Sequence, residues 1–151
     1  TLCRDILPLA SLLTPNLPEA EAITGRSIRG EEGMREAARR IQAMGAGNVL
    51  IKGGHSEGPP VDILLCADGF VRFPGERIPS KNTHGTGCTL SSAIAANLAN
   101  GGSLPQAVEN AKHYVTEAIR HAIPIGHGHG PVHHFYAASG FLMPDGRTER
   151  N

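Results

Sequence analysis

The stretch Asn82-Thr-His-Gly-Thr-Gly-Cys-Thr-Leu-Ser91 joins a glycine-containing loop to the small-residue run Ser92-Ala-Ile-Ala-Ala-Asn97. Gly85 and Gly87 permit backbone conformations that turn several N–H groups to one side and so form a nest for an anion. A helix that starts there adds unpaired N–H donors and the positive end of its dipole. The pattern predicts a phosphate site; the alternative is a glycine-rich turn that only starts a buried helix.

The residues before this loop alternate between strand and helix patterns. An apolar run at 10–14, stopped by Pro15, predicts a buried strand. A proline in the first turn and Gly25 at the end predict a helix over 18–25, and apolar residues at helical spacing predict another over 31–44. A second buried strand is expected at 48–52. The order is therefore strand, helix, helix, strand.

Two further strands and two helices follow. Residues 61–66 and 70–73 flank Ala67-Asp68-Gly69, which predicts a hairpin. Helices are expected from Thr86 to about Asn100 and over 104–122. Strands that alternate with paired helices predict an α/β fold with a mainly parallel sheet covered on both faces.

Ligands of such sheets bind beyond the carboxyl ends of the strands. Asn16, Lys52 and the Gly85 loop each follow a strand or a strand-like segment, so they are expected to converge there.

Composition excludes several classes of function. Lys plus Arg and Asp plus Glu each count 14, so the net charge is zero and no basic surface for nucleic acid or an anionic membrane is expected. No apolar run approaches membrane-spanning length. We therefore expect a cytoplasmic protein that acts on a small molecule.

The cysteine and histidine patterns do not predict a metal site. Cys3, Cys66 and Cys88 are an odd count without paired spacing, which predicts neither a disulfide framework nor a CxxC site. The stretch Gly126-His-Gly-His-Gly-Pro-Val-His-His-Phe135, here called the histidine tract, lacks the two-plus-two spacing of a zinc site. It is interpreted as a rigid loop at the edge of an active site.

Four residues outside the nest glycines are candidates for catalysis or metal binding, each with a structural alternative. A thiol in the first turn of a helix, as at Cys88, ionises more readily and could act as a base, or it could simply be packed. Lys52 could neutralise a transferring phosphate, or its ammonium could extend to solvent. Asn16 and Glu19 could hold Mg²⁺ through water, or they could cap a helix.

Four motifs, taken together, resemble the hydroxymethylpyrimidine/phosphomethylpyrimidine kinases of thiamine biosynthesis, a branch of the ribokinase superfamily. They are Asn16-Leu-Pro-Glu19, Lys52-Gly-Gly-His55, the 82–91 stretch and the end of the histidine tract from Gly128 to Phe135. The resemblance runs from about residue 7 to 135. It implies a three-layer ribokinase-like fold and ATP- and Mg²⁺-dependent phosphorylation of 4-amino-5-hydroxymethyl-2-methylpyrimidine, then of its monophosphate.

The resemblance also implies roles for individual residues. An anion hole around the transferring phosphoryl group would be formed by Gly85, Thr86, Gly87 and Cys88. Lys52 would bind ATP phosphates, Asn16 and Glu19 would organise Mg²⁺, and Thr83 and His84 would lie near the nucleotide. Most superfamily relatives have an Asp base where Cys88 stands, so the identity of the base stays open.

The resemblance leaves the organisation of the whole protein open. Family members are longer on the N-terminal side, where most of the pyrimidine pocket lies. Residues 1–136 are thus expected to be the C-terminal part of a kinase domain that is inactive alone and dimeric when complete. Residues 137–151 are expected to be a tail. Alternatives are a pyridoxine/pyridoxal kinase of the same superfamily and an inactive nucleotide-binding remnant.

Overall fold

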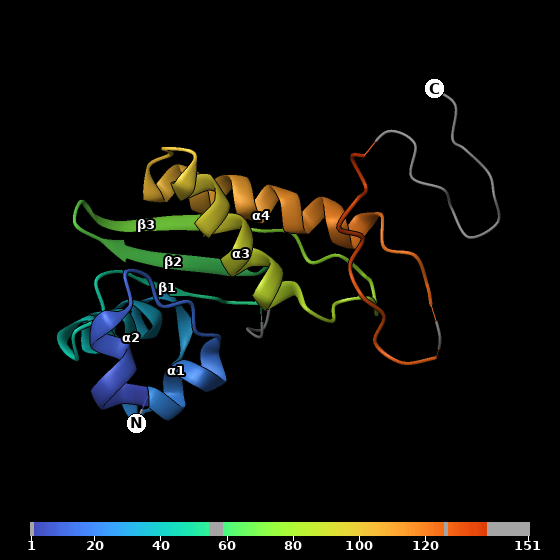
Figure 1. Cartoon of the computed structure of the whole chain (residues 1–151). Coiled ribbons are helices and arrows are strands. Elements are labelled where there is room, and N and C mark those ends of the chain that lie inside the picture. Colours follow the sequence, from blue (N-terminus) through green and yellow to red (C-terminus); the bar gives the residue numbers. More distant parts are fainter. Residues whose placement is uncertain (1, 55–58, 126, 139–151) are drawn as a thin grey trace. The chain divides into compact units, whose positions relative to one another are not determined.

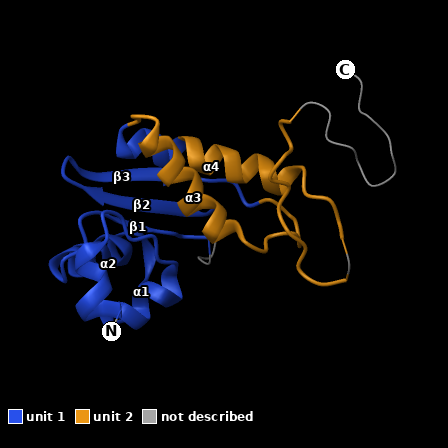
Figure 2. Cartoon of the chain, viewed as in Figure 1, with its two compact units in different colours: residues 1–77, 103–109 blue, residues 78–102, 110–151 orange. Residues whose placement is uncertain are grey.

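A computed structural model describes residues 2–54, 59–125 and 127–138 (Figure 1). The chain forms two compact units, coloured separately in Figure 2. Unit 1 comprises residues 1–77 and 103–109, and unit 2 comprises residues 78–102 and 110–151. The secondary structure is α/β.

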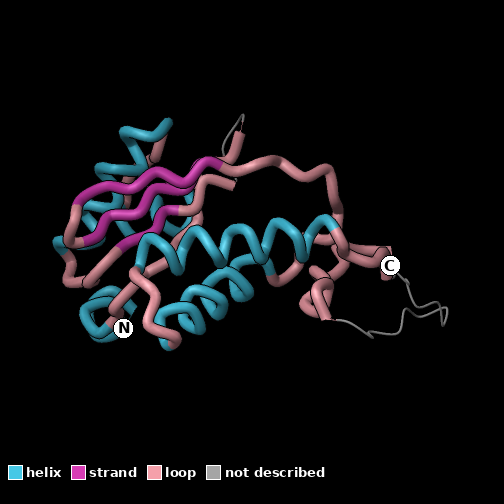
Figure 3. Tube along the Cα trace, turned by 90° about the horizontal axis from the view of Figure 1, so that it is seen from above, coloured by secondary structure: helices cyan, strands magenta, loops and turns pink. Residues whose placement is uncertain are grey.

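The sheet of unit 1 has three strands, β1 (Val49–Ile51), β2 (Val61–Cys66) and β3 (Gly69–Pro74), which lie side by side in Figure 3. Both pairs are antiparallel, with Leu50 opposite Leu64 and Leu64 opposite Val71. The predicted hairpin between β2 and β3 is confirmed.

The prediction of a mainly parallel sheet is wrong for the strands that the structure describes. A parallel pair needs a crossover of about a dozen residues or more. The connections from β1 to β2 and from β2 to β3 are shorter, so each strand folds back on its predecessor.

The segment 10–14 is not the buried strand that was predicted. It runs parallel to β1, with isolated bridges from Leu13 to Val49 and from Asn16 to Lys52, but its side chains are only half-buried or exposed. The segment pairs on one side only, and Pro15 lacks an N–H donor for a longer ladder. Two turns of irregular helix, Leu2–Ile6 and Leu7–Leu9, precede it.

The helices of unit 1 begin and end where the sequence predicts. Helix α1 (Leu17–Thr24) starts at the Asn16 cap and stops at Gly25, whose φ of 67° lies in the left-handed region favoured by glycine. Helix α2 (Gly30–Ala43) turns Met34, Ala37, Ala38 and Ile41 inward.

The core of unit 1 lies between these helices and the strands. It is built from apolar side chains of α2, β1 and β2, with Leu7 and Ala20 added from the N-terminal segments. Seven of its side chains are fully removed from solvent, and they are Leu7, Ala20, Ala38, Ile41, Val49, Ile51 and Ile63. This packing fixes β1, and therefore the position of Lys52 directly after it.

Unit 2 contains α3 (Thr86–Ala99), the larger part of α4 (Leu104–Arg120) and the histidine tract. The side chain of Asn110 on α4 donates to Oδ1 of Asn97 on α3 at 2.9 Å. Across the described residues, no helix has both the length and the hydropathy needed to cross a membrane.

Candidate functional site

The N-terminus of α3 carries backbone donors that no side chain caps. Gly85 occupies the N-cap with φ 83°, and no side chain caps the helix. Within the described residues, the amide nitrogens of Gly87 and Cys88 have no hydrogen-bond acceptor. Two unpaired donors at the positive end of a helix dipole attract an anion.

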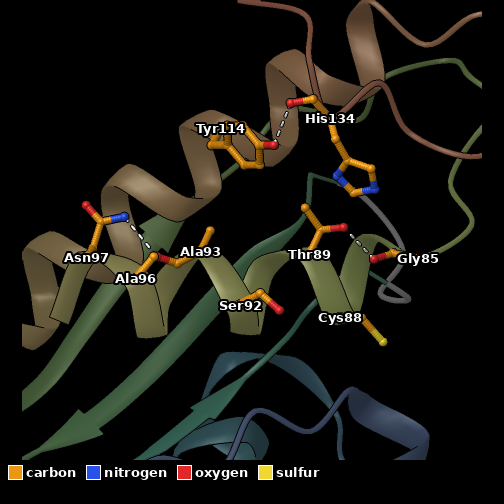
Figure 4. A pocket seen from close by; sticks show the side chains of 9 residues that line it. All are labelled: Gly85, Cys88, Thr89, Ser92, Ala93, Ala96, Asn97, Tyr114 and His134. Carbon is orange, nitrogen blue, oxygen red and sulfur yellow. Dashed lines mark hydrogen bonds between the residues drawn. The ribbon is translucent and has the colours of Figure 1, made fainter. Parts of the chain in front are cut away.

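The first turn of α3 carries its side chains in two directions. The hydroxyl of Thr89 donates to the carbonyl oxygen of Gly85 at 2.8 Å, which fixes the turn. Cys88 is exposed and unpaired with another cysteine. Figure 4 shows its Sγ directed away from Tyr114 and His134. The thiol is therefore accessible to solvent, and Cys88 also contributes to the lining of the cleft described next.

A cleft of about 630 Å³ runs along α3 from this nest. Figure 4 shows its lining, which is shared by α3, α4 and the histidine tract: Gly85, Cys88, Thr89, Ser92, Ala93, Ala96, Asn97, Tyr114 and His134. Small side chains on α3 form its floor. The cleft is mostly apolar with a few polar groups, the lining that small-molecule sites usually have.

The histidine tract lies against the loop that precedes the nest. The amide of His84 donates to the carbonyl of Gly130 at 3.1 Å, and Nδ1 of His129 lies 3.2 Å from the carbonyl oxygen of Lys81. Gly130 itself leaves no room for a side chain, because a Cβ there would lie 2.3 Å from Oδ1 of Asn82. The tract thus forms the support of the segment that carries Thr83, His84 and the nest.

The same tract is tied to α4. The amide of His133 donates to the carbonyl of Ala118 at 2.9 Å, and the Tyr114 hydroxyl donates to the carbonyl of His134 at 2.8 Å. Tyr136 stacks on His121 at a centroid distance of 5.4 Å.

The environment of Tyr136 reflects this packing. Burial raises the pKa of its hydroxyl above the ordinary value, and the nearby carboxylate of Glu117 and the ring of Tyr114 add to the rise. The stack thus encloses part of the ring and links the residue after the tract to the residue after α4.

The remaining candidate residues lie in unit 1. The side chain of Asn16 accepts from the amide of Glu19, and Oε2 of Glu19 accepts from the amide of Asn16, both at 2.8 Å. The amide of Lys52 donates to the carbonyl of Pro15 at 2.9 Å, which brings Lys52 beside Asn16. Within the described residues the ammonium of Lys52 makes no hydrogen bond or ion pair.

The structure therefore brings the predicted site residues together in two groups. Asn16, Glu19 and Lys52 form one group in unit 1, and residues 83–88 form the other in unit 2. His55 lies outside the described residues. In the described part of the chain no cluster of three His, Cys, Asp or Glu side chains could hold a metal ion.

Sequence reasoning missed several residues of interest. Tyr114 and Asn97 line the cleft from α4 and α3, and the helical pattern of these residues did not indicate this role. Asp62 was also missed. It is the buried carboxylate of β2, and an acidic residue inside an otherwise apolar strand is a signal that could have been used.

Comparison with known proteins places these features in a family. Residues 1–133 match the family model described as phosphomethylpyrimidine kinase. The chain is 59% identical over 134 residues to the thiamine biosynthesis bifunctional protein ThiED of Geobacter sulfurreducens, covering 88% of this chain and 27% of that protein. It is 50% identical over 139 residues to the hydroxymethylpyrimidine/phosphomethylpyrimidine kinase of Rhizobium meliloti, covering 89% and 52%.

Solved structures of kinases are also similar to this chain. The pyridoxal kinase of Staphylococcus aureus in complex with AMP-PCP superposes with a TM-score of 0.84 at 34% identity, over 91% of this chain and 51% of that one. The phosphomethylpyrimidine kinase of Clostridium difficile superposes with a TM-score of 0.67 at 42% identity, over 78% and 47%. The chain spans about half the length of the kinases named here. It spans a smaller share of the bifunctional protein ThiED.

Proposed function

The chain belongs to the phosphomethylpyrimidine kinase family, and on that basis we propose that it carries the ATP-phosphate end of a kinase of thiamine biosynthesis. The substrates are hydroxymethylpyrimidine and then its monophosphate. The architecture proposed for the whole domain is the three-layer ribokinase-like fold. The observation that carries the proposal is the uncapped start of α3, where the amides of Gly87 and Cys88 lack acceptors.

The groups present fit a nucleoside triphosphate. Backbone donors at a helix N-terminus suit phosphate oxygens, and an unpaired lysine suits the charge on a polyphosphate. The cleft beside the nest suits the flat, partly apolar nucleoside. Thr83 and His84 directly precede the nest in the chain and are proposed to lie near the nucleotide. ATP would supply the phosphoryl group that is transferred.

The protein's own contribution is positioning and electrostatics, which dominate phosphoryl transfer. The amides from Gly85 to Cys88 are proposed to hold the oxygens of the transferred group. Lys52 is proposed separately to bind ATP phosphates. Cys88 is the candidate base that takes the proton of the substrate hydroxyl. Its exposed thiol fits that role.

Magnesium fits Asn16 and Glu19 only with water between. The capping box engages Oδ1 of Asn16 and Oε2 of Glu19, and among the described residues Oε1 of Glu19 has no hydrogen-bond or ion-pair partner. Mg²⁺ binds carboxylates while keeping several of its waters, so one free oxygen on an exposed side chain suffices for that contact.

Two glycines at opposite ends of α3 provide the test of the nest. Gly85 has φ 83° and Gly101 has φ 86°, and an added Cβ would meet nothing within 4 Å at either position. Gly85→Ala and Gly101→Ala therefore impose the same backbone strain, roughly 1 kcal/mol. We expect calorimetric titration with a non-hydrolysable ATP analogue and Mg²⁺ to show weaker binding only for Gly85→Ala. Equal affinities in the two variants would refute the phosphate site.

A pyridoxal kinase is the second candidate, because pyridoxal kinases superpose on this chain with TM-scores of 0.83 to 0.84. Sequence favours the pyrimidine, since kinases named for it are 42% to 50% identical to this chain, against 33% to 36% for those pyridoxal kinases. Turnover of the full-length protein with each substrate decides between them. We expect the larger kcat/KM with hydroxymethylpyrimidine.

The expected cytoplasmic location, the absence of nucleic-acid and membrane partners and the dimeric state remain parts of this proposal. Fractionation and light scattering test them.

A further inference from the structure

Asp62 is a buried carboxylate that the proposed mechanism does not use. It lies on β2, the central strand of the sheet, and only 7% of its surface is exposed. Charged side chains are almost never buried unless they are paired or hydrogen-bonded. Its Oδ1 accepts the backbone N–H of Gly53 at 2.8 Å. The carboxylate therefore stabilises the chain immediately after Lys52.

Gly53 is pressed against β2 at the same point. A Cβ at this position would lie 2.0 Å from the carbonyl oxygen of Val61 and 3.0 Å from its carbon, both of which belong to the backbone. A backbone neighbour cannot move aside as a flexible side chain can. The position requires glycine because of this close approach, and the approach is what allows the N–H of Gly53 to reach Asp62.

Lys52 is held from the other side by its own amide. That N–H donates to the carbonyl of Pro15 at 2.9 Å. Two successive amides thus point to opposite sides, one toward the segment 10–16 and one toward β2. The two hydrogen bonds fix the backbone on both sides of the Lys52 side chain.

We propose that Asp62 is a positioning residue, which sets the direction of Lys52 through the hydrogen bond to Gly53. This inference rests on the proposed function in one respect, namely that Lys52 binds phosphate. Positioning matters at such a site, since a displacement of about 1 Å can cost on the order of 10²-fold in rate. An Asn at position 62 would keep the acceptor, whereas an Ala would remove it.

A double-mutant cycle on the 151-residue chain tests the coupling. The variants are Lys52→Ala, Asp62→Ala, Asp62→Asn and the double alanine variant, and the measurement is the Kd for AMP-PCP with Mg²⁺. The matched control is Ile63→Val, which trims a fully buried neighbour on the same strand without touching the acceptor.

We expect Asp62→Ala to raise Kd by roughly three- to tenfold, the range for a lost hydrogen bond. In the double variant, Kd should stay within about twofold of that for Lys52→Ala alone, because the two residues act as one unit. Asp62→Asn should restore most of the affinity, and Ile63→Val should bind as the parent does. Additive effects of Lys52→Ala and Asp62→Ala would overturn the proposal.

A second readout is independent of nucleotide binding. The rate at which an amine-reactive reagent labels Lys52, followed by mass spectrometry, should change in Asp62→Ala and not in Ile63→Val. If the parent chain fails to bind AMP-PCP, the phosphate role of Lys52 fails, and the labelling rate still decides whether Asp62 positions it. Unchanged labelling in Asp62→Ala would refute the positioning role even in a chain that binds nucleotide.

Discussion

An alanine at position 130 would bring its Cβ to 2.3 Å from Oδ1 and 2.9 Å from Cγ of Asn82. Real Cβ atoms essentially never approach other heavy atoms below 3.0 Å, so something must move. The same residue accepts the N–H of His84, which directly precedes the Gly85 N-cap. The substitution therefore disturbs the support of the phosphate nest without altering any residue of the nest itself.

The loss of stability in Gly130→Ala depends on which atoms can move away from the added Cβ. Overpacking costs about 1–3 kcal/mol in general. The lower part of that range applies here, because the nearest atom, Oδ1, lies at the end of the Asn82 side chain, which can rotate away from the new Cβ. At about 2–4 °C for each kcal/mol in a chain of this size, the melting temperature should fall by roughly 2–8 °C.

Gly128 supplies the matched control, since it lies in the same tract and an added Cβ there would meet nothing within 4 Å. Gly128→Ala should leave both the melting temperature and the affinity for AMP-PCP close to those of the parent. Gly130→Ala should lower both, as followed by calorimetry. Adding Asn82→Ala to Gly130→Ala should recover most of the loss by removing the colliding atoms. Equal behaviour of the two glycine variants, or no recovery in the double variant, would show that the tract does not support the nest.

Three further outcomes can be measured. If Cys88 is the base, Cys88→Ala in the full-length enzyme should lose on the order of 10²–10⁴ in turnover, with Cys88→Asp retaining more, and near-normal turnover would leave the thiol a packing residue. Hydrogen bonding to Arg72 lowers the pKa of Glu31 in the folded protein. The stability that the Glu31 carboxylate contributes is therefore present above the ordinary glutamate pKa and lost as pH falls through the pKa of Glu31 in the folded protein. Arg72→Gln should raise the Glu31 pKa measured by NMR. In an ultraviolet titration, Glu117→Gln should lower the raised pKa of Tyr136 only in part, because burial is a larger cause of the rise than Glu117. A full return to the ordinary tyrosine pKa would show that Glu117 is the larger cause.

Local sequence signals predicted local structure well. The Asn16 and Glu19 pair forms the reciprocal capping box expected of helix capping, and Gly25 ends α1 in the left-handed conformation. The loop at 67–69 forms the hairpin between β2 and β3. In each case the interaction spans only a few residues, so the residue types alone determine it.

Strand direction was not predictable in the same way. The apolar runs at 49–51 and 61–66 look alike whether they pair parallel or antiparallel, and only the length of the connection distinguishes them. The way in which the histidine tract supports the nest could also not be predicted from the sequence. It depends on the contact between Gly130 and Asn82, which are far apart in the sequence.

The capping box limits how Asn16 and Glu19 can serve a metal ion. If Mg²⁺ took Oε2 of Glu19 or Oδ1 of Asn16 directly, it would compete with an amide hydrogen bond at the start of α1. Losing such a cap costs about 1 kcal/mol. Contact through Oε1 and retained water avoids this cost, because the cap then stays intact and holds the carboxylate in place. Helix capping and metal binding, which the sequence presents as alternatives, are therefore compatible in the same pair of residues.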